Sequence, residues 1–174
     1  MSTNWSDVID GPDRLQIGGG AHRQWVSRVP ALYARHEARA GAKDSEDVAG
    51  RDAILTLDEG AIAVFRVPGT DRPPVAKTTI GPVYELQPGA SLAVPTGRVL
   101  IRFADSVEAE TRRDELREAG YGIDRLLSYA RNAAWLTARS GRIGDALRGI
   151  DRLVALNGVE HVEPEMRMTR QSRE

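Results

Sequence analysis

The chain has 174 residues, of which 41% are hydrophobic and 5% aromatic, and its formal net charge at pH 7 is −1. This length suits one domain or two small ones with a mainly aliphatic core. The balanced charge argues against a general nucleic-acid binder, and the absence of cysteine excludes disulfides, thiolate metal sites and a cysteine nucleophile. No apolar run approaches the roughly 20 residues that span a bilayer, and no secretory signal is recognised, so we expect a cytoplasmic location without membrane binding.

The first 50 residues are expected to form an N-terminal arm with one short helix. Apolar residues near the start show no sustained period, and the triple glycine Gly18–Gly20 is interpreted as a flexible hinge, because no phosphate-loop sequence follows it. From Trp25 to His36 apolar side chains recur at spacings of three and four, which predicts a helix divided by Pro30. The polar stretch from Gly41 to Gly50 is typical of a linker.

Residues 51–95 are expected to form a β-rich subdomain of unknown role. The turn sequence Asp58-Glu59-Gly60 lies between two apolar runs and predicts a hairpin. A proline-rich loop separates this hairpin from two shorter strands. The strand candidates are 53–57, 61–67, 75–80 and 83–86.

The C-terminal part has the most regular pattern. A capping-box-like start at Asp105 and Glu108 predicts the first helix, and apolar residues at i, i+3, i+4 and i+7 from Ile143 predict the second. The expected elements are strand 98–103, helix 105–119, strand 123–127, strand 133–138, helix 143–154 and strand 159–164. This β-α-β-β-α-β order predicts an α+β fold, the ferredoxin-like split βαβ sandwich, with two helices on one face of an antiparallel sheet.

Several segments of this part also carry a family resemblance. They are Val99–Phe103, Gly120–Ile123, Ala133–Ala138, Ile143–Leu156 and Gly158–Glu165. Their sequences, order and spacing resemble the propeptide of subtilisin-type serine proteases over about residues 98–171. We therefore divide the chain into an arm (1–50), the β-rich subdomain (51–95) and a propeptide-like domain with a C-terminal tail (96–174).

The resemblance implies a function in protein binding. Members of that family place their sheet face on the protease and their C-terminal tail in its substrate cleft, and they assist folding of the protease and then inhibit it. The chain is accordingly expected to bind a subtilisin-like serine protease as an inhibitor, a folding chaperone in trans, or both. No protease sequence follows the resembling part, and some 95 additional residues precede it.

The residues expected to contact the protease lie in the last strand and the tail. Alternation along the strand places Glu163 and Glu165 on the side away from the core, where their carboxylates could meet helix N-termini of the protease. Met168 is expected to fill a deep pocket of the cleft. The full set of expected protease-binding residues is Glu163, Glu165, Met166, Met168, Thr169, Arg170 and Gln171.

Catalysis is not expected. The three histidines, His22, His36 and His161, are scattered, and the sequence has neither a Gly-x-Ser-x-Gly elbow nor a His-Glu-x-x-His metal motif. No cofactor or metal is therefore predicted. The alternative interpretation is a ferredoxin-like regulatory or RNA-binding module without catalytic activity; Phe103 and Trp135 are the only aromatic candidates for base stacking.

Overall fold

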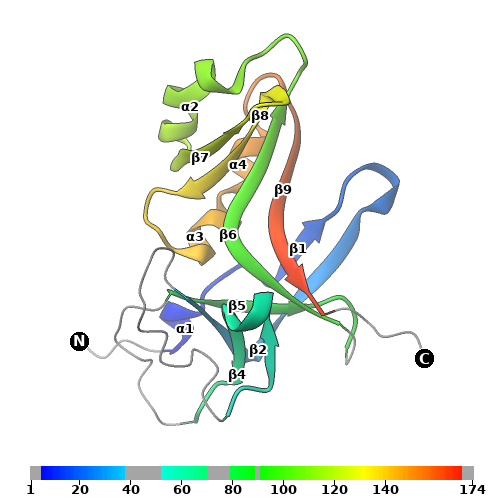
Figure 1. The fold of residues 1–174 in the computed structure, drawn as a ribbon, viewed down its shortest axis with the longest axis vertical. Helices are drawn as coiled ribbons and strands as arrows, with labels where there is room; N and C mark the ends of the chain where they lie inside the picture. The colour runs from blue at the N-terminus through cyan, green and yellow to red at the C-terminus, as the bar shows by residue number, and fades with distance from the viewer. Residues whose placement is uncertain (1–4, 38–51, 70–78, 89–90, 170–174) are drawn as a thin grey trace.

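Among the residues that the structure describes, strands account for 51% and helices for 21%. In the computed structural model, which describes residues 5–37, 52–69, 79–88 and 91–169, nine strands join into one mainly antiparallel sheet (Figure 1). The strands are β1 (Arg14–Ile17), β2 (Gln24–His36), β3 (Leu55–Leu57), β4 (Ile62–Arg66), β5 (Thr79–Glu85), β6 (Leu92–Phe103), β7 (Tyr121–Leu127), β8 (Ala130–Ala138) and β9 (Val159–Met168). The helices are α1 (Trp5–Val8), α2 (Arg113–Glu118), α3 (Ile143–Arg148) and α4 (Ile150–Val154), with 3-10 turns η1 (Gly20–His22), η2 (Asp58–Gly60) and η3 (Ala109–Arg112).

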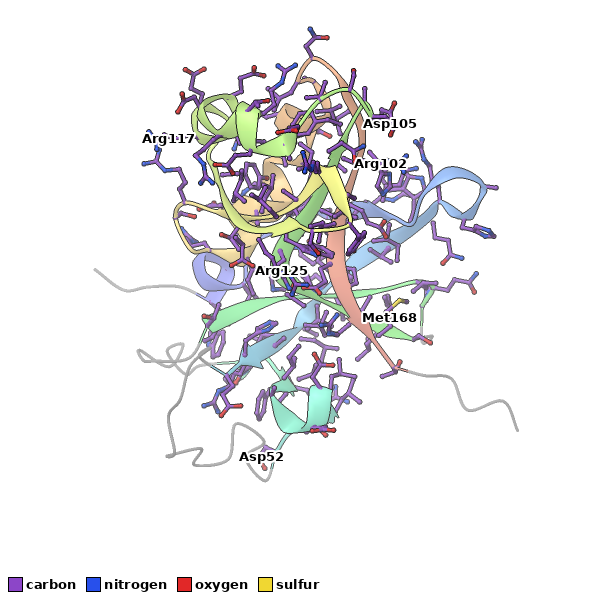
Figure 2. The ribbon with its side chains drawn as sticks, turned by 45° about the horizontal axis from the view of Figure 1, so that its top comes forward. Asp52, Arg102, Asp105, Arg117, Arg125 and Met168 are labelled. Atoms are coloured by element: carbon purple, nitrogen blue, oxygen red, sulfur yellow. The ribbon has the colours of Figure 1, made fainter. Side chains whose placement is uncertain are left out.

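β6 connects the two halves of the sheet. The strand order is β3-β4-β2-β5-β6-β8-β7, with β1 added to β2 and β9 added to β6. The first residues of β6 pair with β5, residues 98–102 pair with β8, and β9 follows β6 from Ala93 to Phe103 (Figure 1). Figure 2 shows Arg102 at one end of the β6–β9 pair and Met168 at the other.

The helices cover one face of the C-terminal half of the sheet. Val99, Ile101 and Phe103 alternate along β6 and are fully buried, together with Leu116 of α2 and Leu153 of α4. Fully burying a large apolar side chain contributes about 1.5–3 kcal/mol. This cluster therefore holds the helices on one side, and the side chains between its β6 members face the other side.

α3 also packs on the N-terminal half. Ile143 and Leu147 join a second buried cluster with Leu15, Ile17 and Tyr84, which come from β1 and β5. The same helical segment thus packs on both halves of the sheet, since Ala146 belongs to the first cluster.

The predicted fold class, a ferredoxin-like split βαβ sandwich preceded by a β-rich region, is wrong. The succession of strands and helices from β6 to β9 follows the expected order, but these strands are part of the nine-stranded, mainly antiparallel sheet. The physical reason is the length of β6 and β9, which have 12 and 10 residues. β6 begins at Leu92, before the expected start at Arg98, and its first residues pair with β5. Backbone hydrogen bonds therefore connect the expected β-rich subdomain to the expected propeptide-like domain.

The predicted helix between Trp25 and His36 is also wrong, since these residues lie in β2. The register of β2 against β5 shifts between Arg28 and Tyr33, a segment that includes Pro30. Proline is tolerated at such irregular positions of a sheet. The shift interrupts the period-2 alternation, so apolar residues on its two sides fall at spacings that imitate a helical face.

Other elements differ from expectation mainly in their limits. The hairpin around η2 is confirmed as β3 and β4. The first 20 residues, whose apolar side chains show no sustained period, nevertheless include α1 and β1. The helix expected from Asp105 begins as the 3-10 turn η3. The second helix is divided at Gly149, where an added Cβ would lie 2.2 Å from Tyr121 Oη. The predicted linker 41–50 lies outside the described residues.

Candidate functional site

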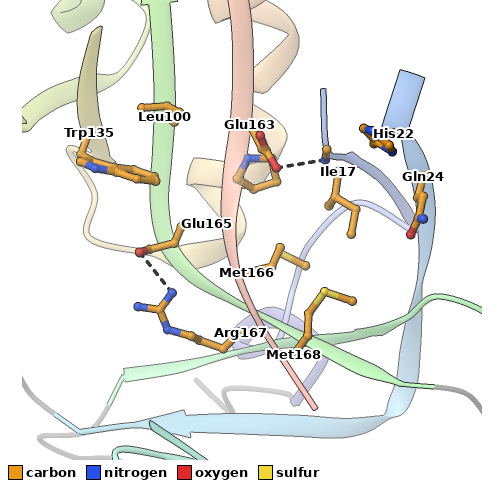
Figure 3. Close-up of a pocket in the computed structure, with 12 residues that line it drawn as sticks. Ile17, His22, Gln24, Leu100, Trp135, Glu163, Glu165, Met166, Arg167 and Met168 are labelled. Carbon is orange, nitrogen blue, oxygen red and sulfur yellow. Dashed lines mark hydrogen bonds and ion pairs between the residues drawn. The ribbon is translucent and has the colours of Figure 1, made fainter. Parts of the chain in front are cut away.

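The four strands β9, β6, β8 and β7 present a face that the helices do not cover. Trp135 on β8, Leu100 on β6 and Glu163 on β9 are register partners, so they form one row across three strands. Their neighbours Val99, Ile101 and Leu136 belong to the buried cluster under the helices. By alternation, the row therefore faces away from the helices (Figure 3).

A pocket of about 510 Å³ lies on this face, between it and the β1–β2 hairpin (Figure 3). We call it the Trp135 pocket. Its lining residues are Ile17, Gly18, His22, Gln24, Leu100, Trp135, Glu163, Pro164, Glu165, Met166, Arg167 and Met168. The lining combines an indole ring and aliphatic side chains with two carboxylates, which suits an apolar side chain of a partner protein better than a small polar molecule.

Glu163 fastens the β1–β2 hairpin to β9. Its Oε1 accepts a hydrogen bond from the Gly18 backbone N–H at 3.0 Å, and its Oε2 lies 3.0 Å from Nε2 of His161. Gly18 has a φ of 76°, a conformation that favours glycine. The triple glycine is thus the tip of a hairpin held by one carboxylate, and Glu163 is already engaged within the chain.

Replacing Glu163 with alanine should loosen this tip with a small loss of stability. The substitution removes one hydrogen bond to a backbone amide, so unfolding should become easier by about 1 kcal/mol. The Gly18 amide should exchange with solvent faster, as measured by NMR hydrogen exchange, while amides of β8 keep their protection. An unchanged Gly18 exchange rate would mean that the Glu163 bond does not hold the hairpin.

Glu165 lies at the centre of a chain of charges. Its Oε2 accepts a hydrogen bond from Thr96 Oγ1 at 2.7 Å and lies 3.8 Å from the Arg98 guanidinium, and its Oε1 lies 3.3 Å from Arg167. Arg98 also pairs with Asp124 at 3.1 Å, and Arg167 pairs with Asp58 at 2.6 Å. These contacts connect η2, β6, β7 and β9, so Glu165 has a structural role in addition to any role in binding.

The other expected binding residues divide into two groups. Met166 packs against the buried cluster of β1 and β5, and the 39% exposed Met168 lines the Trp135 pocket. Both belong to β9, and the Thr169 backbone N–H donates to Leu92 O at 3.3 Å, so the expected free tail is bound to β6 up to that residue. Arg170 and Gln171 lie outside the described residues.

Sequence reasoning missed two contributions to this pocket. Leu100 and Trp135 were not expected to contact a protease, and Trp135 was considered only for base stacking, although alternation in strands 98–103 and 133–138 places both on the face opposite the apolar majority. The contribution of Ile17, His22 and Gln24 had no sequence signal, because the approach of the β1–β2 hairpin to β9 is a long-range contact.

Another pocket, of about 430 Å³, lies where β2, β6 and β9 meet and includes His36, Asp58 and Arg167. His36 is 9% exposed, and its Nε2 has no hydrogen-bond partner among the described residues. Burial lowers the pKa of the imidazole to about 4, against the opposing effect of the Asp58 carboxylate. Within the described part of the chain, no three His, Cys, Asp or Glu side chains are grouped to hold a metal ion.

Acidification should destabilise the protein through His36. In the unfolded chain the imidazole titrates near its ordinary pKa of 6.5, whereas in the folded chain it titrates near 4. The unfolded state therefore binds more protons between these values, and stability should fall as the pH drops from about 6.5 to about 4, by about 3 kcal/mol in total. Urea unfolding at pH 7, 5.5 and 4.5 measures this loss. His36→Leu should reduce the pH dependence, and His22→Gln, at an exposed site, should leave it unchanged.

No family model, curated protein or solved structure matches the chain. The resemblance to subtilisin propeptides is therefore supported only by the segments quoted from the sequence. Among the described residues, no helix has the length and apolar character needed to cross a lipid bilayer.

Proposed function

We propose that the chain binds a subtilisin-like serine protease through the uncovered face of the strands β6, β7, β8 and β9. We propose further that it inhibits the protease, assists its folding, or does both. The observation that carries this proposal is the row of Trp135, Leu100 and Glu163 on a sheet face that the helices leave open. The resemblance implies that this face meets the protease. The encounter would take place in the cytoplasm, the location expected from the sequence.

The Trp135 pocket supplies the apolar centre that such a contact needs. Binding energy in protein interfaces is concentrated in a few large side chains, with tryptophan the most enriched. Arg98 stacks on Trp135, with its guanidinium carbon 4.8 Å from the ring centroid, and this contact holds the indole in place. An indole that is ordered before binding loses little freedom on complex formation.

The position of Glu163 modifies the expected role of the carboxylates. Each Glu163 oxygen already has one partner, but a carboxylate oxygen can accept a second hydrogen bond. Glu163 can thus still accept N–H groups of a protease helix while holding the hairpin. Glu165 also lines the pocket, but its side chain is only 14% exposed and it is engaged by Thr96, Arg98 and Arg167, so it supports the face from within the chain.

The test separates docking on the face from occupation of the cleft. Binding to subtilisin is measured by calorimetry and inhibition by hydrolysis of a peptide substrate, with full-length protein and with a variant that lacks residues 170–174. The truncated variant should retain binding and lose most of the inhibition, because only the tail is expected to enter the cleft. If full-length protein does not bind subtilisin or another subtilisin-like protease at micromolar concentration, the proposed function is wrong.

A further inference from the structure

β1 is an edge strand with unpaired backbone groups. Among the described residues it pairs with β2 alone. The Arg28 N–H donates to Asp13 O at 2.8 Å, which makes Arg14 and Ser27 a pair without mutual hydrogen bonds. By the antiparallel alternation, Arg14 and Gln16 direct their N–H and C=O groups away from β2. These groups have no backbone partner elsewhere in the described chain.

The outer side of β1 opens into a groove of about 730 Å³, which we call the β1 groove. One wall is formed by β1, the start of β2 and the residue before it, and includes Arg14, Arg23 and Trp25. The opposite wall is formed by α4 and the start of β9, including Arg152 and His161. The groove is distinct from the Trp135 pocket, with which it shares only Gly18.

The β1 groove is positively charged although the whole chain has a net charge of −1. Four arginines line it, against the two carboxylates of Asp151 and Glu160. Arg148 is paired with Asp10, whereas Arg23 is exposed and forms no ion pair with a described residue. An anionic ligand would therefore find arginine side chains that are available for pairing.

The β1 groove also has exposed apolar side chains beside its arginines. Trp25 is 53% exposed, with the Arg14 guanidinium 5.0 Å from its ring centroid, and Val154 of α4 is 56% exposed. Leu147, buried at the floor, belongs to the cluster beneath β1. An exposed tryptophan beside arginines is the composition found at centres of protein interfaces.

We propose that the β1 groove binds an extended acidic peptide as an additional strand on the outer edge of β1. The free N–H and C=O groups of Arg14 and Gln16 match a peptide backbone, and Arg14 and Arg23 match carboxylates at alternate positions. The edge of β9 is unsuitable for the same purpose, because Pro164 and a register shift near its start interrupt it. The inference does not depend on protease binding, because it uses a different surface.

A fluorescein-labelled octapeptide of alternating Glu and Val tests the proposal by fluorescence anisotropy at low salt. We expect saturable binding to the full chain that weakens as salt rises. Arg14→Glu combined with Arg23→Glu should weaken it at least tenfold. The matched control is Arg125→Glu, an exposed arginine on β7 outside the groove, which should leave the affinity unchanged. Urea unfolding checks that each variant remains folded.

Two comparison peptides and one oligonucleotide test whether the groove selects an acidic peptide in the extended conformation. A Lys-Val octapeptide should not bind, because its charge is reversed, and a Glu-Pro octapeptide should bind at least tenfold more weakly, because proline has no N–H. The amides of Arg14 and Gln16 should gain hydrogen-exchange protection only with the Glu-Val peptide. The proposal is overturned if the Glu-Val peptide does not saturate, if either comparison peptide binds equally well, or if an eight-residue oligothymidylate binds more tightly.

Discussion

Replacing Glu165 with alanine is expected to lower the free energy of unfolding by about 2–4 kcal/mol. The substitution removes the acceptor of the Thr96 hydroxyl and one partner each of Arg98 and Arg167. Arg98 is the main reason for a large effect, since its side chain is only 13% exposed and a cation left with fewer partners in such a site costs free energy. Urea unfolding at pH 7 measures the loss.

Glu160→Ala is the matched control on the same strand. The Glu160 side chain is 49% exposed and lies 3.8 Å from Arg102, so its removal should change stability by less than about 1 kcal/mol. Equal effects of the two substitutions would show that the charges around Glu165 do not connect the sheet halves. A destabilised Glu165→Ala protein would also make any loss of protease binding in that variant ambiguous, which is why Glu163 is the better carboxylate for a binding test.

The role of Glu165 illustrates what the sequence cannot provide. The alternation of strand 159–164 was sufficient to place Val162 on the side of the helix-covered cluster and Glu163 on the other side, because this pattern depends on neighbours in the chain. The partners of Glu165 are Thr96, Arg98 and Arg167. Arg167 in turn pairs with Asp58, which lies 109 residues away in the sequence. Such long-range pairs leave no periodic signal in the sequence. Glu165 was therefore expected to be a surface carboxylate, whereas in the structure it is part of a network of charged side chains.

Local patterns predicted many of the individual elements. The hairpin around Asp58–Gly60 and the succession of elements from β6 to β9 could be derived from turn residues and periodicity. β2 could not, because the shift between Arg28 and Tyr33 disguises a strand as a helix. The limits of β6 were also not predictable, because the pair Thr96-Gly97 is typical of a turn. In the structure Gly97, with a φ of 90°, lies inside the strand at a register shift against β9.

The uncovered sheet face was predictable in part. The assignment of Glu163 to the side away from the core follows from alternation, and so would that of Leu100 and Trp135. The wall contributed by Ile17 and Gln24 could not be derived, because it depends on the hydrogen bond between Glu163 and Gly18, 145 residues apart. The candidate site therefore combines a sheet face that alternation predicts with a hairpin that only the tertiary structure brings to it.

Replacing Trp135 with alanine should weaken binding to a subtilisin-like protease by about 2 kcal/mol or more, roughly thirtyfold in Kd. The indole is the largest side chain lining the Trp135 pocket, and Leu100 and Met168 cannot fill the space that it leaves. Stability should change less than binding, because Trp135 lies on the uncovered face outside the buried cluster. Calorimetric titration with subtilisin, together with urea unfolding of the free protein, separates the two effects.

Two further variants make the Trp135 result decisive. Trp135→Phe should recover much of the affinity, because a phenyl ring still forms an aromatic wall of the pocket and can stack under Arg98. Tyr129→Ala removes an aromatic side chain that is 82% exposed and does not line the pocket, so it should leave the affinity unchanged. If Trp135→Ala binds as tightly as the unmodified chain while full-length protein still inhibits the protease, the docking surface is not the uncovered face. Deletion of residues 170–174 then tests whether the C-terminal tail makes the contact instead, in which case binding is lost together with inhibition.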